Sequence, residues 1–207
     1  RDVLGSRGLG DVYKRQLLTG VTKFSQITVF WGFNQPNDIS MDSRYDAICG
    51  ITEDELYSVF GEAISDMANK FDYTVDEMKS LLKKQYDGYH FSEALLDIYN
   101  PFSIINAFDK LKLDNYWYKS GTPTYLVKLL EGHHVNMQKL TSRPYESQYF
   151  VDYRADAENP LAMLYQSGYL TIKGYDRHYR EYTLDYPNVE VRKGFVTLMA
   201  EANKCCS

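Results

Sequence analysis

Residues 159–199 read NPLAMLYQSGYLTIKGYDRHYREYTLDYPNVEVRKGFVTLM, and the predicted fold depends most on this stretch. The Asn-Pro pair, the apolar residues after it and then Gly168 predict a short helix that ends in a left-handed glycine. Residues 169–173 and 180–184 are rich in β-branched and aromatic residues, so they predict two strands joined as a hairpin through Gly174 and Asp176. Apolar residues at helical spacing after the Pro-Asn pair predict a final amphipathic helix.

The preceding segment, residues 51–150, predicts a helical region. Two Thr-x-x-Glu patterns, in which side chain and backbone cap each other, begin helices expected over 52–70 and 74–85. Few residues connect these helices, so we expect them to pack antiparallel. An Asn-Pro pair and a Thr-Pro pair predict further helices near 101–111 and 123–132.

The chain is therefore expected to be mostly α with minor β. The order of helix, hairpin and helix over residues 151–203 is similar to a winged-helix arrangement. A generic helical domain with one hairpin fits the same pattern, so both interpretations stay open.

Composition indicates a folded chain without a membrane partner. Hydrophobic residues make up 44% of the 207 residues, and 19 of them are tyrosines. The net charge of −5 gives the whole chain no attraction to nucleic-acid phosphates or to an anionic membrane, although a local basic patch remains compatible with it. No apolar run is long enough to span a bilayer, and the three cysteines show no disulfide or metal-binding spacing. We expect a cytoplasmic protein.

The first 16 residues, RDVLGSRGLGDVYKRQ, show neither the strand period nor the helix period. Reverse translation of residues 6–16 gives an in-frame codon string that looks like a transposon-based sequencing adaptor. We therefore expect residues 1–16 to be a non-native tail that packs against nothing. The end, residues 204–207, is expected to be truncated or frame-shifted.

Several phrases carry a resemblance to a known family: LLTGVTKFSQITVF, YDGYHFS, YNPFSIINAF, YWYKSGTPTYLV and LYQSGYLTIK. Together they resemble bacterial AAA-ATPase-like proteins, which are often followed by a PD-(D/E)XK nuclease domain. The resemblance implies that residues 17–50 are the C-terminal part of a P-loop ATPase core, 51–150 a helical lid region and 151–203 the winged-helix-like segment.

The resemblance also implies that the groups for ATP hydrolysis lie elsewhere. This sequence contains no G-x-x-x-x-G-K-[ST] motif, no acidic magnesium-holding strand and no D-x(n)-[DE]-x-K nuclease pattern. ATP and magnesium are implied for the full-length protein, with no cofactor and no catalytic residue in this fragment. The expected partners in cis are an N-terminal ATPase half and a C-terminal nuclease-like domain.

By the same resemblance, Thr19, with Thr22 and Lys23 behind it, matches the position of a nucleotide sensor at the end of a core strand. A polar group there can orient the attacking water beside the γ-phosphate. The alternative is a tight turn after Thr19 with a solvated lysine.

Two other polar groups invite a chemical interpretation. Asp87, His90 and Ser92 supply the residue types of a catalytic triad, but neighbours in one loop rarely converge on one reacting atom, so a structural inter-domain loop is expected. His133 and His134 are adjacent, and neighbouring side chains are expected to point to different sides, so no metal site is predicted.

Three functions are compatible with the sequence. The parent protein is an ATP-driven bacterial enzyme, or the chain is an interaction module with a tyrosine-rich surface, or it binds nucleic acid through the winged-helix-like segment. Basic residues cluster in that last segment, as a DNA surface requires. They are Lys173, Arg177, Arg180, Arg192 and Lys193.

Overall fold

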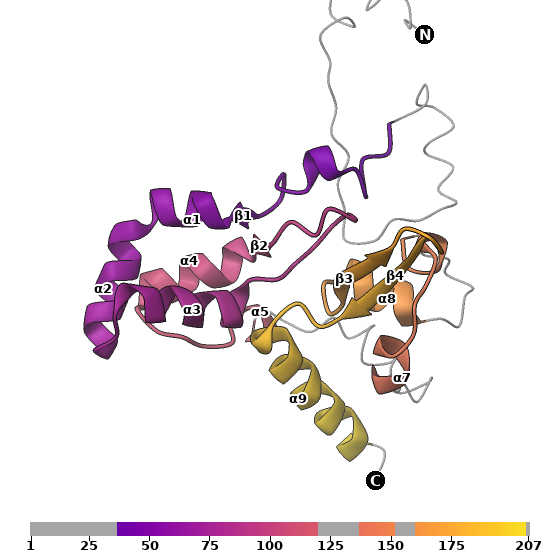
Figure 1. The fold of residues 1–207 in the computed structure, drawn as a ribbon. Helices are drawn as coiled ribbons and strands as arrows, with labels where there is room; N and C mark the ends of the chain where they lie inside the picture. Colours follow the sequence, from indigo (N-terminus) through magenta and orange to yellow (C-terminus); the bar gives the residue numbers. More distant parts are fainter. Residues whose placement is uncertain (1–36, 120–136, 152–159, 206–207) are drawn as a thin grey trace, which may run out of the picture.

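The computed structural model describes residues 37–119, 137–151 and 160–205 (Figure 1). The described helices are α1 (Glu53–Val59), α2 (Gly61–Phe71), α3 (Val75–Tyr86), α4 (Pro101–Lys110), α5 (Tyr116–Lys119), α7 (Met137–Thr141), α8 (Pro160–Gln166) and α9 (Val189–Cys205). The described strands form two antiparallel pairs, β1 (Ile51–Thr52) with β2 (Ile98–Tyr99) and β3 (Thr171–Asp176) with β4 (Glu181–Asp185). The prediction of a mostly helical chain with minor β structure is confirmed.

Buried side chains form two clusters. The helical cluster lies among α1 to α4, which pack on one side of the molecule in Figure 1, and it includes Leu56, Ile64, Met67, Met78, Leu82, Tyr86, Tyr99 and Ile104. The hairpin cluster lies among α8, the β3–β4 pair and α9, and it includes Tyr89, Phe150, Leu161, Leu164, Tyr169, Ile172, Leu184, Val191 and Phe195. Helix α9 also contacts α3 and α5, so it joins the two groups of elements.

The first predicted helix is wrong in one respect, because residues 52–70 form two helices. Thr52 and Glu55 make the expected capping box at the start of α1, and Thr74 and Glu77 make the one at the start of α3. At Phe60 the backbone leaves the helical conformation, with φ −110° and ψ 17°. The Phe60 ring stacks on a ring of α4 at 5.4 Å between centroids, a long-range contact that helical periodicity does not contain.

The predicted order of helix, hairpin and helix is confirmed in α8, β3, β4 and α9. Gly168 has φ +80° after α8, as expected for a left-handed residue. The predicted connection began too early: Gly174 lies inside β3 at a register irregularity, Asp176 is the last residue of β3, and residues 177–180 make the turn. A Cβ at Gly174 would lie 2.7 Å from Thr183 Oγ1, so glycine permits the close approach of the two strands there.

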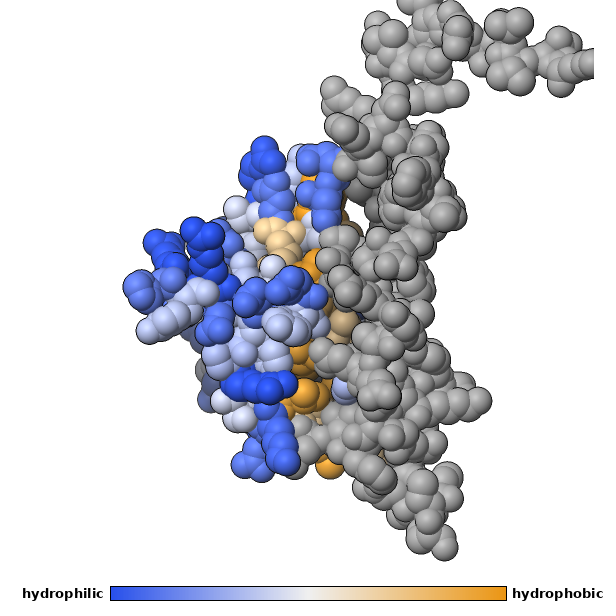
Figure 2. All heavy atoms as spheres, turned by 90° about the vertical axis from the view of Figure 1, so that its right-hand side faces the viewer, coloured by the Kyte–Doolittle hydropathy of each residue, from blue (hydrophilic) through white to orange (hydrophobic). Residues whose placement is uncertain are grey.

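Other expectations fall partly outside the described residues. The helix near 101–111 is confirmed by α4, whereas the one near 123–132, the adaptor-like residues 1–16 and most of the predicted ATPase-core remnant lie outside them. No described helix has the length and apolarity needed to cross a membrane. On the face shown in Figure 2, hydrophobic side chains gather in a vertical band with hydrophilic ones on its left.

Candidate functional site

The loop at residues 86–92, YDGYHFS, connects the two clusters. Tyr86 belongs to the helical cluster and Tyr89 to the hairpin cluster. The backbone N–H of His90 donates to Thr171 Oγ1 at 2.8 Å, and the Thr171 hydroxyl donates to the His90 carbonyl oxygen at 2.9 Å. These hydrogen bonds are buried, so the loop is fixed to β3 rather than held by its own turn alone.

The His90 imidazole is held at both nitrogens. Nδ1 lies 2.6 Å from the carbonyl oxygen of Ile172, and Nε2 lies 2.7 Å from Asp97 Oδ1. One nitrogen therefore faces a backbone carbonyl and the other a carboxylate, so the ring is bonded on both sides. This arrangement makes His90 a cross-link between the loop, β3 and the residues before β2.

Lys83 lies among three carboxylates, one of which, that of Asp97, also bonds to His90. Its Nζ lies 3.2 Å from Asp97 Oδ2, 3.3 Å from Glu53 Oε2 and 3.6 Å from Asp87 Oδ2. Asp87 is only 2% exposed, and burial raises the pKa of its carboxyl group, with the nearby Lys83 charge acting in the opposite direction. The network ties α1, α3 and the loop together.

The triad interpretation of this loop finds no support in the geometry. The Ser92 hydroxyl donates to Asp46 Oδ2 at 2.6 Å, whereas the His90 ring is bonded to Asp97 and Ile172. Asp87, His90 and Ser92 therefore have separate partners on three different segments. The structural interpretation, a loop between two parts of the chain, describes what is observed.

A second buried junction forms at the start of α9, around Glu190. This side chain is fully buried, and it accepts hydrogen bonds from Ser103 Oγ at 2.7 Å and from the Trp117 backbone N–H at 2.8 Å. Burial raises the pKa of the Glu190 carboxyl group, and the hydrogen bonds oppose that shift. Glu190 thus holds α9 against α4 and α5. The sequence placed this residue in the final helix but gave no signal of its burial.

The basic residues predicted to contact DNA are in different environments. Lys173 is partly buried and donates to the carbonyl oxygens of Gly88 at 2.7 Å and Pro187 at 3.1 Å, and burial lowers its pKa. Its ammonium group therefore holds β3 to the loop and to the residues before α9.

The other four basic residues are exposed, and they form two pairs. Arg177 and Arg180 lie in the β3–β4 turn, whereas Arg192 and Lys193 lie in the first turns of α9. Because β4 runs from the turn to the start of α9, the two pairs stand at opposite ends of the hairpin. The structure does not gather the five residues into one patch.

The predicted sensor residues Thr19, Thr22 and Lys23 lie outside the described residues, as do His133 and His134. Within the described ranges, no group of three or more His, Cys, Asp or Glu side chains is arranged to hold a metal ion.

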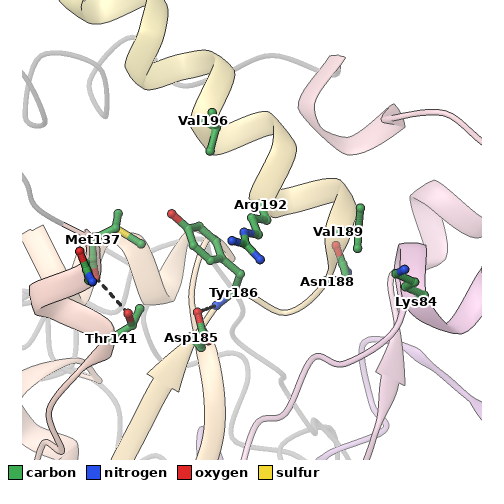
Figure 3. A pocket seen from close by; sticks show the side chains of 10 residues that line it. Lys84, Met137, Thr141, Asp185, Tyr186, Asn188, Val189, Arg192 and Val196 are labelled. Carbon is green, nitrogen blue, oxygen red and sulfur yellow. Dashed lines mark hydrogen bonds between the residues drawn. The ribbon is translucent and has the colours of Figure 1, made fainter.

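A groove of about 610 Å³ opens between α7, the end of β4 and α9 (Figure 3). It was not anticipated from the sequence, because its walls come from three separate parts of the chain. Its lining combines two cations, one carboxylate, a tyrosine ring and apolar side chains. The residues are Lys84, Met137, Gln138, Thr141, Asp185, Tyr186, Asn188, Val189, Arg192 and Val196.

Comparison with known proteins gives one informative similarity. The chain is 34% identical over 178 residues to an uncharacterized protein in the vnfD 5' region of Azotobacter chroococcum mcd 1. The aligned part is 85% of this chain and 32% of that protein, so the chain spans about a third of the length of this relative. No family model matches the chain, and no solved structure matches it.

Proposed function

We propose that this chain is a non-catalytic connecting module of a larger AAA-ATPase-like protein. The observation that carries the proposal is the loop at residues 86–92, whose conspicuous polar groups are bonded across the two clusters instead of facing a shared reacting atom. The relative is about three times as long as the aligned region, which supports a role within a longer protein. ATP and magnesium would be bound by another part of that protein.

A connecting module transmits movement only if the contact between its two clusters, here the one between loop 86–92 and β3, is rigid. Here His90 and Thr171 exchange buried hydrogen bonds, and Lys173 bonds both the loop and the residues before α9. Opening a buried hydrogen bond leaves a costly unpaired group, so such bonds between segments far apart in sequence resist separation of those segments. A change in the ATPase core would therefore reach α9 through a stiff connection, with Thr19, Thr22 and Lys23 proposed as the nucleotide-sensing end.

The test compares ATP hydrolysis by the 207-residue chain and by the full-length protein that contains it. We expect turnover by the full-length protein alone. In that protein, Thr171→Val should lower turnover several-fold and leave nucleotide binding unchanged, whereas Thr183→Val on the exposed side of the same hairpin should alter neither. ATP turnover by the 207-residue chain, or equal effects of the two threonine variants, would contradict the proposal.

Nucleic-acid binding is a second candidate function, favoured by the exposure of Arg177, Arg180, Arg192 and Lys193. None of these four side chains makes an ion pair within the described part of the chain. Each phosphate contact should contribute about 0.7–0.9 to the slope of log K against log salt. Retention on DNA that does not weaken with salt would argue against this function.

A further inference from the structure

The groove between α7 and α9 holds an aromatic ring with one cation beside it, and a second cation, Lys84 of α3, lies on the far side of Asn188 and Val189 (Figure 3). Tyr186 projects from the end of β4 toward the middle of the groove, and in the view of Figure 3 Arg192 lies between this ring and Lys84. We propose that this groove binds single-stranded nucleic acid, with one base stacked on Tyr186 and the adjoining phosphates held by Arg192 and Lys84. The inference rests on the second function proposed above and assigns its site.

The charges of the groove favour an anionic ligand. Lys84 and Arg192 are exposed, and neither is ion-paired within the described part of the chain. Asp185 is the one carboxylate among the lining residues, and its Oδ1 already accepts the backbone N–H of Tyr186 at 2.7 Å. Two cations against one engaged carboxylate give this groove a positive balance on a chain whose net charge is −5.

Tyr186 is suited to act as a stacking platform. Its ring packs on Phe195 of the hairpin cluster, with 5.7 Å between centroids and 55° between planes, so its position is fixed from below. Burial raises the pKa of the Tyr186 hydroxyl to about 12, which keeps the ring neutral beside a phosphate at physiological pH. Every nucleic-acid base has a flat π-face, so a fixed aromatic ring accepts any of them.

Asn188 and Thr141, two of the polar side chains of the groove, are already engaged within the protein. Asn188 is occupied on both sides of its amide, because Nδ2 donates to the Asp87 carbonyl oxygen and Oδ1 accepts from Val191 N–H. Thr141 donates its hydroxyl to the Met137 carbonyl oxygen. The site should therefore bind single strands with little sequence preference, since stacking and phosphate contacts do not distinguish bases well.

The open shape of the groove favours a strand over a free nucleotide. Its volume of about 610 Å³ matches the size of small-ligand pockets, but Val196, one turn along α9 from Arg192, is still 60% exposed. A free mononucleotide would bury little of its surface there. A strand can enter and leave along α9 and add phosphate contacts on both sides of the stacked base.

An acidic peptide would use the two cations but would have no need of the ring. The proposal therefore predicts that Tyr186 contributes as much as the charges do. A double-stranded ligand is disfavoured because its bases are already stacked within the helix and cannot reach Tyr186 without unpairing.

The test measures binding of a labelled oligothymidylate to the full 207-residue chain by fluorescence anisotropy at low salt. Loss of a base–aromatic stack is worth roughly 5- to 150-fold in affinity, so Tyr186→Ala should weaken binding by about 10-fold or more, with Tyr186→Phe within about twofold of wild type. Lys84→Ala and Arg192→Ala should each weaken binding and lower the salt slope by about one unit. Lys70→Ala on α2, an exposed cation outside the groove, is the matched control and should leave affinity nearly unchanged.

Several results would overturn the site. The first two are equal affinity of wild type and Tyr186→Ala for the strand, and binding of thymidine monophosphate as tight as that of the strand. The other two are equal affinity for an abasic strand and for oligothymidylate, and binding of polyglutamate that is tighter than that of oligothymidylate and depends on Lys84 and Arg192 alone. Lys84 is exposed, so its variant keeps the test valid if Tyr186→Ala disturbs folding. Binding that depends on Arg177 and Arg180 but not on Lys84 or Tyr186 would leave nucleic-acid binding standing and refute the groove.

Discussion

The buried carboxylate of Glu190 allows a sharp test of how α9 is fixed to the helical part of the chain. Glu190→Ala would remove two hydrogen bonds, from Ser103 Oγ at 2.7 Å and from Trp117 N–H at 2.8 Å. Hydrogen bonds to a charged group contribute about 1.5–3 kcal/mol each, but burial opposes the charge of this carboxylate, as its raised pKa shows. We expect the free energy of unfolding to fall by about 2–4 kcal/mol.

Glu190→Gln is the matched control for this change. A glutamine can accept from Trp117 N–H with its oxygen and donate to Ser103 Oγ, because the serine hydroxyl rotates to accept. We expect it to cost less than about 1 kcal/mol at neutral pH. Because the folded-state pKa of Glu190 is raised, wild-type stability should fall as pH rises through that pKa, and Glu190→Gln should remove this part of the fall.

The assay is urea unfolding followed by circular dichroism, with Ser103→Ala and the double variant completing a cycle. The two groups are in direct contact, so their effects should be non-additive by about 0.5–3 kcal/mol. If Glu190→Ala costs no more than Glu190→Gln, or if the alanine changes at Glu190 and Ser103 simply add, the junction does not hold α9 as described.

Three further perturbations test other parts of the fold. Thr171→Val removes the hydroxyl that bonds to the His90 backbone. We expect it to lower the free energy of unfolding in urea by about 1–3 kcal/mol, whereas Thr183→Val should change it by less than about 0.5 kcal/mol. Equal losses of stability in the two variants would argue against the His90–Thr171 contact. Thr74→Ala should cost about 1 kcal/mol and speed amide exchange in the first turn of α3, and unchanged exchange would contradict the capping box. Burial raises the pKa of Asp87, so ionisation of this carboxyl group opposes folding. The stability of the wild type, measured as urea midpoints over a pH series, should therefore fall as pH rises through that pKa, and the stability of Asp87→Asn should fall less. If the wild type instead gains more stability than Asp87→Asn over the same rise in pH, ionisation of Asp87 favours folding and the prediction is wrong.

Much of the local structure could be predicted from the sequence. Both capping boxes, the Asn-Pro start of α4 and the left-handed Gly168 were found as expected. These features depend on residues no more than a few positions apart, because a cap satisfies backbone groups within its own helical turn. The broken helix at Phe60 and the misplaced hairpin turn were missed, since a ring from α4 and a strand irregularity at Gly174 decide them.

The tyrosines also separate what the sequence predicts from what the fold decides. Their abundance was evident in the sequence, but the structure assigns many of them to the two clusters, with Tyr86, Tyr99 and Tyr169 among the largest fully buried side chains. Composition cannot distinguish a buried ring from an exposed one when the ring carries a hydroxyl that suits either place.

The candidate sites were decided by tertiary structure. Residues separated by 81 positions form the His90–Thr171 joint, and residues separated by 87 positions form the Ser103–Glu190 junction. Lys173 looked like a free cation in the sequence and became a donor to two carbonyl groups once the chain folded back on it. The sequence by itself determined where α1, α3, α4 and α8 begin and which residues can carry charge. Only the fold determined which charges are buried and which remain exposed, because burial and pairing depend on segments that the sequence does not place side by side.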